Sequence, residues 1–266
     1  MLGGLTGAQD VKPGYVIDKD TGIILPKGFD AEILYDIPKS QGSWVAMAFD
    51  PTGRLIVSDQ DSEGVFRVTL PTEGKEIAVE SLKGFPYEPV QWGKRRVGGA
   101  LGFLYAFDSL YMTTMTGFYR CRDTDGDDQF DEFKLLKKLQ MGYEHSAHSV
   151  IKSEDGKALY LVSGNYGRIP KGISWKQPPV WEVDSLLDPM PDAMGHAVSI
   201  KPPGGWVCRI SPDGEDWEMI ASGFRNPVDL AINREGEMFT FDSDLEFDVG
   251  THARKSHSLR AAGAEF

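Results

Sequence analysis

The sequence is poor in cysteine and in long apolar runs. Only two cysteines occur among 266 residues, Cys121 and Cys208, and neither belongs to a Cys-x-x-Cys pair, so the chain carries no covalent haem or zinc signature. Both lie in apolar, strand-like contexts, which favours buried thiols over a disulfide. No run approaches the roughly 18 apolar residues that a membrane-spanning helix needs, and the first residues lack the pattern of a secretory signal peptide.

Basic residues are also fewer than acidic ones. The chain has 28 Lys and Arg against 40 Asp and Glu, a formal net charge of -12, which repels a phosphate backbone and excludes nucleic acid as a partner. Cations and neutral polar substrates fit such a surface better. The 30 Gly and 16 Pro are spread along the whole chain, and this predicts many short strands joined by tight turns in an all-β fold.

One pattern recurs along the chain. An apolar strand, a polar turn closed by glycine and a second strand together predict a β-hairpin, in which the glycine supplies a positive φ. The three clear copies are WVAMAFDPTGRLIVSDQ, HSVIKSEDGKALYLVSGN and VDLAINREGEMFTFDSD, which start at Trp44, His148 and Val228 and turn at Gly53, Gly156 and Gly236. A weaker copy starts at Gly99 and turns around Asp108 and Ser109.

Further strands accompany these hairpins. GVFRVTL, GFYRCRD and GWVCRIS each alternate after a glycine, and we assign residues 131–139 (DEFKLLKKL) to a strand as well. The hairpins recur at intervals of about 50, 50 and 80 residues, which is the period of propeller blades with one insertion. A closed propeller normally needs more than four blades, so the repeats predict a partial, truncated β-propeller.

Two sites of polar residues directly precede predicted inner strands, which line the central channel of a propeller. His145 and His148 precede one strand, and Arg225 and Asn226 precede the next. An imidazole there suits a general base, and a guanidinium suits a carboxylate or a quinone oxygen. The alternative is structural, with the histidines hydrogen-bonded to neighbouring loops and Arg225 paired with an acidic loop.

Two acidic clusters are candidate calcium sites. In DTDGDDQFDE, Asp123, Asp125 and Asp127 alternate around Gly126, which lets hard oxygen ligands converge. The loop lacks the EF-hand glycine at its sixth position, which is Asp128, and a solvated acidic turn is the alternative.

The second cluster, FDSDLEFDVG, follows a predicted inner strand. Asp242, Asp244 and Asp248 place like charges close together there, and either a bound cation or neighbouring Lys and Arg side chains would relieve their repulsion.

The segment 165–203 has little strand pattern and is too long for a plain connection. Its Trp175 and Trp181 suit stacking on a sugar above the channel. Packing over the propeller is the alternative.

The run GFRNP, followed by an apolar strand and a glycine turn, resembles the Gly-x-Arg-Asn-Pro segment of soluble PQQ-dependent glucose, aldose and sorbosone dehydrogenases. His145 matches the catalytic histidine of that family. PKGFDAEILYDIP, EHSAHSV, GHAVSIKPPGGWVCRISPDG and FTFDSDLEFDVGT are similar to a branch known as the membrane-bound dehydrogenase domain, found in large bacterial haem-binding proteins. The likeness runs from Leu25 to Thr251.

This resemblance implies a truncated six-bladed ring, with residues 1–24 as an N-terminal extension, 25–251 as about four blades with the insertion 165–203, and 252–266 as an irregular end. His145 would take the proton of a sugar hydroxyl while hydride passes to PQQ. Arg225 would bind the quinone, with Asn226 and His148 beside it, and calcium would polarise the cofactor.

The resemblance further implies a haem or cytochrome module as electron acceptor and a periplasmic or extracellular location. The alternatives are a non-catalytic propeller that binds a carbohydrate or a protein, and a calcium-dependent, lactonase-like hydrolase.

Overall fold

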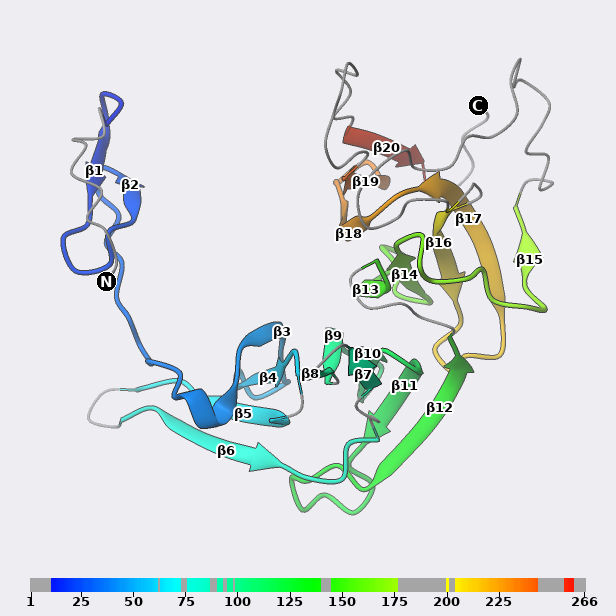
Figure 1. The fold of residues 1–266 in the computed structure, drawn as a ribbon, viewed down its shortest axis with the longest axis horizontal. Helices are drawn as coiled ribbons and strands as arrows, with labels where there is room; N and C mark the ends of the chain where they lie inside the picture. Colours follow the sequence, from blue (N-terminus) through cyan, green and yellow to red (C-terminus); the bar gives the residue numbers. More distant parts are fainter. Residues whose placement is uncertain are drawn as a thin grey trace.

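Sheets of short antiparallel strands lie side by side in an open arc (Figure 1). The structure is a computed structural model that describes residues 11–61, 63–72, 76–86, 90–92, 95–97, 99–139, 145–176, 200, 204–243 and 256–260, the strands 90–92, 95–97 and 256–260 by their backbone alone. Among these residues one 3-10 turn, η1 (Lys39–Gln41), is the sole helical element. The predicted all-β fold is confirmed.

The first two blades follow the four-stranded pattern of a propeller. Blade 1 consists of β3 (Trp44–Phe49), β4 (Leu55–Asp59), β5 (Val65–Thr69) and β6 (Ala78–Leu82). Blade 2 consists of β9 (Ala100–Ala106), β10 (Ser109–Thr114), β11 (Gly117–Arg122) and β12 (Glu132–Lys138). Strand β12 confirms the strand predicted for residues 131–139.

The next two blades continue the arc. Blade 3 consists of β13 (Ala147–Lys152), β14 (Leu159–Ser163), β16 (Gly205–Ile210) and β17 (Trp217–Phe224), with the short β15 (Ser174–Trp175) parallel to β17. Blade 4 consists of β18 (Pro227–Ile232), β19 (Glu237–Asp242) and β20 (Ser256–Arg260). The insertion therefore lies within blade 3, between β14 and β16.

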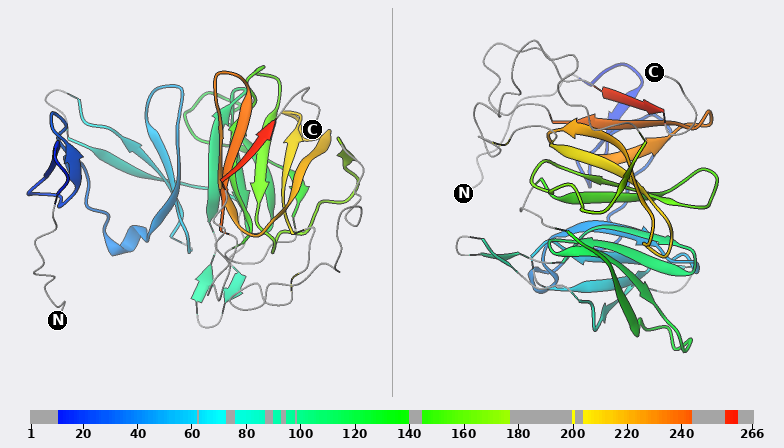
Figure 2. Two further views of the ribbon diagram at one scale, coloured as in Figure 1. Left: turned by 90° about the horizontal axis from the view of Figure 1, so that it is seen from above. Right: turned by 90° about the vertical axis from the view of Figure 1, so that its right-hand side faces the viewer.

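The inner strands β3, β9, β13 and β18 are neighbours in chain order, because β9 contacts both β3 and β13, and β13 contacts β18. The sheets stack one on the next, as the right-hand view of Figure 2 shows. The described sheets do not close a ring, so the fold is a partial β-propeller.

Strands outside the four blades are short. Two hairpins are formed by β1 (Tyr15–Ile17) with β2 (Ile24–Pro26) and by β7 (Val90–Trp92) with β8 (Arg95–Val97). The β1–β2 hairpin stands apart from the arc (Figure 1) and spans the predicted boundary at residue 25. Strand β20 lies within the segment expected to be irregular and pairs with β19 through its backbone, which needs no apolar alternation.

The three clear hairpins turn at the predicted glycines. Gly53, Gly156 and Gly236 have φ of 83°, 67° and 80°. In the fourth hairpin the turn lies at Phe107 and Asp108, with φ of 51° and 50°, one residue earlier than predicted. Two successive residues of positive φ match the twist of a two-residue hairpin even without glycine.

The core lies between the blades, because alternate residues of a strand face opposite neighbours. On β10, Leu110 packs in the cluster shared with blade 1, whereas Tyr111 packs in the cluster shared with blade 3. Cys121 belongs to the first of these clusters and Cys208 to the second, and both are buried free thiols, as predicted. In the part of the chain that is described, no helix is long and apolar enough to cross a bilayer.

Candidate active site

The candidate site lies at the rim where the inner strands begin. His145 comes just before β13, and Arg225 and Asn226 come just before the neighbouring β18. Asn165 joins the two segments, because its side-chain Oδ1 lies 2.7 Å from His145 Nδ1 while its backbone N–H donates to the Arg225 carbonyl at 2.7 Å. The imidazole and the arginine segment therefore share one rim of adjacent blades.

His145 is held on several sides. Its side chain is only 3% exposed, and its ring stacks on Tyr166 with 4.6 Å between centroids and 22° between planes. The backbone N–H groups of Tyr166 and Gly167 both donate to the His145 carbonyl. A Cβ at Gly164 would lie 2.8 Å from the His145 main chain and 2.7 Å from Asn226 Oδ1, so this approach requires glycine.

The segment carrying Arg225 is fixed by Asp242 at the end of β19. The two carboxylate oxygens of Asp242 accept the backbone N–H groups of Arg225 at 3.0 Å and of Asn226 at 2.7 Å. Arg225 is 9% exposed, and its Nη1 donates to the Ser243 carbonyl at 3.2 Å. Asp242, which is 2% exposed, thus anchors the loop from which the guanidinium projects.

Asp242 was predicted as a metal ligand together with Asp244 and Asp248. The latter two lie outside the described residues, so the metal site stays a prediction. What the structure adds is a structural role for Asp242.

A buried aspartate also accepts a backbone N–H in blade 1, where Asp59 is 1% exposed and accepts the N–H of Ser43 at 2.6 Å. Asp59 is the register partner of Trp44, just as Asp242 is the partner of Pro227. An acid at the end of the second strand thus holds the loop before the first strand in both blades.

His148 is the second residue of β13, and not a residue before it as predicted, and it lies between the neighbouring inner strands β9 and β18. Its Nε2 is 3.0 Å from Asn226 Oδ1 on the segment before β18, and its carbonyl accepts Thr113 Oγ1 of β10 at 2.9 Å. A Cβ at Gly102 of β9 would lie 2.0 Å from the same carbonyl, so β9 and β13 approach closely there. His148 therefore orients Asn226 at the rim.

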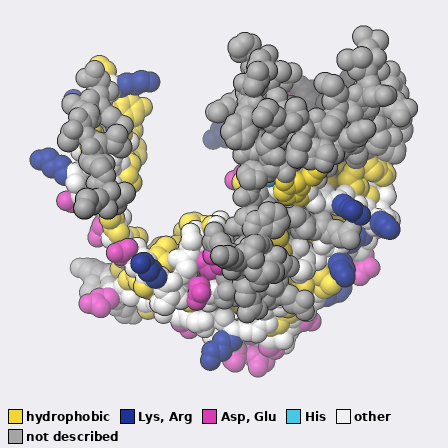
Figure 3. All heavy atoms as spheres, in the orientation of Figure 1, with side chains coloured by type: hydrophobic (Ala, Val, Ile, Leu, Met, Phe, Trp, Pro, Cys, Tyr) yellow, Lys and Arg dark blue, Asp and Glu magenta, His cyan; other side chains and the backbone are white. Residues whose placement is uncertain are grey.

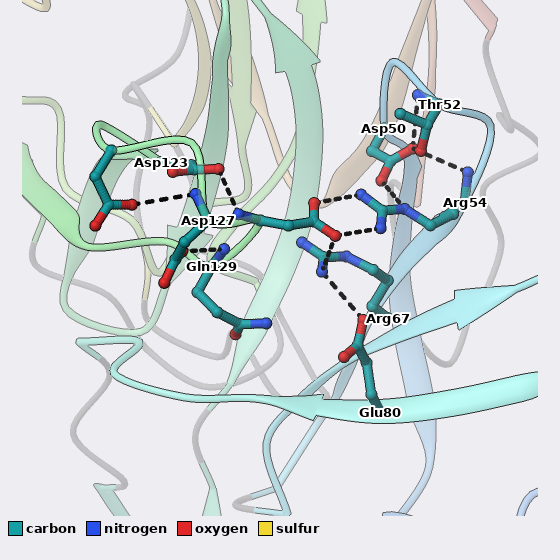
Figure 4. Close-up of polar contacts among 10 residues, drawn as sticks. Asp50, Thr52, Arg54, Arg67, Glu80, Asp123, Asp127 and Gln129 are labelled. Carbon is teal, nitrogen blue, oxygen red and sulfur yellow. Dashed lines mark hydrogen bonds and ion pairs between the residues drawn. The ribbon is translucent and has the colours of Figure 1, made fainter.

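The acidic loop between β11 and β12 lies at the rim of the hairpin turns, opposite the rim of His145. Figure 4 shows the polar contacts of this loop and of Arg54 and Arg67. Arg54, in the β3–β4 turn, binds Asp50 in that turn through Nε at 2.7 Å and binds both carboxylate oxygens of Asp128. Arg67 Nη1 joins Glu80 at 3.0 Å to the same network. Because the hairpin turns lie at the far ends of the inner strands from His145, this loop is separated from the candidate site by the length of a blade.

The three aspartates predicted as calcium ligands do converge. The ligand atoms of Asp123, Asp125 and Asp127 lie within 4.8 Å of one another, and all three residues are exposed. Asp128, at the sixth position, has a φ of 72°, the conformation that glycine supplies in EF-hand loops. The hydrogen bond from Arg54 lowers the pKa of Asp128 and keeps it ionised.

The described part of the insertion runs from the site to the outer edge of blade 3. It begins with Asn165 and Tyr166 at His145 and reaches β15 beside β17. Trp175 is half-buried against the core shared by blades 2 and 3, which corresponds to packing over the propeller rather than stacking above the channel. Trp181 lies outside the described residues.

A polar cleft of about 420 Å³ opens at the rim of the hairpin turns, between blades 3 and 4. Its lining includes Glu154, Asp155, Arg209 and Glu235. Because it lies at the opposite rim from His145, it is separate from the candidate active site.

Asn165, Tyr166 and Gly164 were missed by the sequence analysis. They occur in a Gly-Asn-Tyr-Gly run directly after β14, which the sequence pattern assigned to the start of the long insertion, whereas His145 and Arg225 precede inner strands. A polar side chain at the end of a second strand reaches the same rim, so this position was the available signal.

No family model matches the chain, and no curated protein matches it. Solved structures do resemble it. The PQQ-bound aldose sugar dehydrogenase of Streptomyces coelicolor gives a TM-score of 0.51 at 21% identity, over 76% of this chain and 56% of that chain. The holo PQQ domain of Coprinopsis cinerea pyranose dehydrogenase gives 0.51 at 12%, over 82% and 48%.

A calcium structure of the Trichoderma reesei enzyme of carbohydrate-active family AA12 gives a TM-score of 0.50 at 14% identity, over 77% of this chain and 47% of that chain. The chain thus spans about half the length of these proteins. At such identities the likeness establishes the fold alone, and the chain has the β-propeller fold of PQQ-dependent sugar dehydrogenases in partial form.

Proposed function

We propose that the chain forms the catalytic part of a PQQ-dependent sugar dehydrogenase, in which a sugar hydroxyl is oxidised at the rim that carries His145 and Arg225. The supporting observation is the link through Asn165, which touches the His145 ring with its side chain and the Arg225 carbonyl with its backbone. The base His145 and the cation Arg225, from adjacent blades, are thereby held at a fixed separation. Removal of a proton beside an electron acceptor requires such fixed positions.

His145 is the general base of this proposal. When Asn165 Oδ1 accepts the Nδ1–H, the neutral imidazole keeps its lone pair on Nε2. Stacking on Tyr166 and burial restrict rotation of the ring. Nε2 would then take the proton of the sugar hydroxyl, and the fixed tautomer would keep it ready to do so.

Arg225 and Asn226 are the cofactor-binding residues. Their chemistry fits one end of PQQ, because a guanidinium suits a quinone oxygen or a carboxylate and the Asp242 bridge fixes the backbone of both residues. His148 holds the Asn226 amide in place. Bound PQQ would supply the quinone that accepts the sugar's hydride.

Calcium, the electron acceptor and the location complete the proposal. Calcium near Asp242, Asp244 and Asp248 would polarise the cofactor. Calcium at the Asp123 loop would be a structural ion of blade 2. A haem or cytochrome module would receive the electrons, at a periplasmic or extracellular site. All of these rest on the resemblance.

The test separates binding from chemistry. The chain is reconstituted with PQQ and calcium, PQQ binding is measured by titration, and dye reduction is followed with a panel of aldoses. His145→Ala should leave PQQ binding unchanged and lower kcat by about 10²-fold or more, whereas Arg225→Ala should weaken PQQ binding. Arg234→Ala, at an exposed arginine of the opposite rim, is the matched control and should change neither.

Two results would contradict the proposal. One is a folded chain that binds no PQQ, which favours a propeller that only binds carbohydrate or protein. The other is full dye reduction by His145→Ala.

A further inference from the structure

Asn226 lies at the junction of blades 3 and 4, on the rim that carries His145. Asp242 accepts its backbone N–H at 2.7 Å and so fixes the main chain. The side chain is half-buried and ends in an amide whose two ends differ, because the oxygen only accepts hydrogen bonds and the NH2 group only donates them. The direction of this amide therefore decides which chemistry Asn226 offers to a ligand.

The oxygen end of the amide faces blade 3. Oδ1 lies 3.0 Å from Nε2 of His148 on β13. A Cβ at Gly164, directly after β14, would lie 2.7 Å from the same oxygen, so the chain approaches this oxygen from a second side. Because an amide oxygen cannot donate, the contact with His148 requires a hydrogen on Nε2 of the imidazole. The tautomer of His148 and the direction of the Asn226 amide are therefore coupled.

Blade 2 holds His148 in turn. Thr113 Oγ1 of β10 donates to the His148 carbonyl at 2.9 Å, and the close approach at Gly102 packs β9 against the same carbonyl. The backbone that carries the imidazole is thus fixed on the side away from Asn226. A donor fixed in this way can hold the amide in one direction.

The NH2 end of the amide has no acceptor among the residues that the structure describes. Arg225, whose guanidinium also only donates, directly precedes Asn226 on the same loop. Figure 3 shows apolar side chains along the border of the opening of the arc, so a polar ligand at the inner strands depends on a small number of polar groups. Two successive side chains of this loop therefore offer hydrogen-bond donors.

We propose that His148 is a positioning residue, which holds the Asn226 amide with its oxygen toward blade 3 and its NH2 group toward the ligand. Two neighbouring donor groups suit a quinone or carboxylate oxygen, which only accepts. They suit a sugar hydroxyl less well, because a hydroxyl must also place its own hydrogen. The identity of the ligand rests on the proposed function, so the loop is assigned to the oxygens of PQQ and not to the sugar. The direction of the amide is a property of the chain alone.

The tautomer of His148 tests the direction of the amide without any ligand. Histidine is labelled with nitrogen-15, and long-range proton–nitrogen correlation spectra are recorded at pH 8, where an ordinary imidazole is neutral. The His148 signal is assigned by its loss in His148→Leu, or in His148→Gln if the first variant is unstable. His148 should carry its hydrogen on Nε2. A hydrogen on Nδ1, with Nε2 as an acceptor, would overturn the proposal whether or not PQQ binds.

A double-mutant cycle tests whether His148 acts through Asn226. His148→Leu should weaken PQQ binding about tenfold, roughly the value of one hydrogen bond, and Asn226→Ala should weaken it at least as much. In the Asn226→Ala background, His148→Leu should have no further effect. Thr113→Val is the matched control, because it removes the hydrogen bond to the His148 carbonyl and leaves the imidazole, and it should bind PQQ as the wild type does.

The outcomes separate this proposal from the proposed function. Equal losses of PQQ affinity from His148→Leu in both backgrounds would assign His148 a general structural role and overturn the proposal, while the proposed function would stand. A folded wild-type chain that binds no PQQ would contradict the proposed function, and the tautomer of His148 would still decide the direction of the amide.

Discussion

Truncating Asp242 tests how the loop that carries Arg225 is held. Its two carboxylate oxygens accept two backbone N–H groups, those of Arg225 and Asn226, in a site where Asp242 is 2% exposed. Asp242→Ala leaves both donors without this acceptor, and at about 1–3 kcal/mol for each buried donor the expected loss of unfolding free energy is about 2–6 kcal/mol. Asp242→Asn keeps one acceptor oxygen and should lose about 1–3 kcal/mol.

The assay is urea unfolding followed by tryptophan fluorescence. Asp59→Ala is the informative comparison, because Asp59 holds the equivalent loop of blade 1 and also accepts the N–H groups of Asp61 and Glu63. It should lower stability at least as much as Asp242→Ala, yet only Asp242→Ala should weaken PQQ binding. A loss below about 0.5 kcal/mol for Asp242→Ala, the level of an ordinary surface substitution, would refute this reasoning.

Three further predictions follow from burial and charge. Cys121 and Cys208 should not react with a thiol reagent at pH 8 until the chain is unfolded, because burial raises the pKa of both thiols, that of Cys121 to about 12. Although burial raises the pKa of Asp50, hydrogen bonds from Arg54 and Thr52 outweigh it and lower the pKa overall. The stability that Asp50 contributes is therefore present at neutral pH and lost as the pH falls below about 4, so the deficit of Asp50→Asn in unfolding free energy should shrink in acid. Calcium should raise the thermal midpoint of the chain, and Asp125→Asn should abolish that rise.

Each of these predictions has a control. Early thiol labelling of the native chain would contradict the burial of the cysteines. Asp216→Asn, at an exposed aspartate, should show no acid-dependent deficit. Magnesium at equal concentration separates a specific calcium effect from screening of the acidic surface, and equal stabilisation by both ions would count against a calcium site.

The fold could be predicted from the sequence because its signals are local. A glycine of positive φ between two alternating strands specifies a hairpin without reference to the rest of the chain, and Gly53, Gly156 and Gly236 behave accordingly. The turn at Phe107 and Asp108 was misplaced by one residue, because neither residue type requires a positive φ. Strand β20 gave no signal, since its pairing with β19 depends on backbone groups alone.

Only some residues of the candidate site could be predicted from the sequence. His145 and Arg225 could be singled out because each precedes an inner strand, and adjacent inner strands begin at one rim. For Asn165 the position after a second strand indicates only that the residue lies at this rim, because its contacts with both His145 and Arg225 depend on how two blades pack and not on a spacing within one segment. The same limit applies to Asp242, because the sequence pattern of an acidic residue after a strand is the same whether the carboxylate binds a metal or accepts a backbone N–H.

The position of the acidic groups on two rims bears on how calcium would act. The Asp123 loop lies at the rim of the hairpin turns, where Asp128 is tied to Arg54 of blade 1, whereas Asp242 lies at the rim of His145. One ion cannot serve both, because a strand of six residues separates the rims by about 20 Å. An ion at the Asp123 loop would therefore stabilise the contact between blades 1 and 2 without touching the sugar or the quinone. Removing it should lower the thermal midpoint and leave PQQ affinity unchanged. Loss of an ion beside Asp242 should instead leave the thermal midpoint unchanged and lower PQQ affinity.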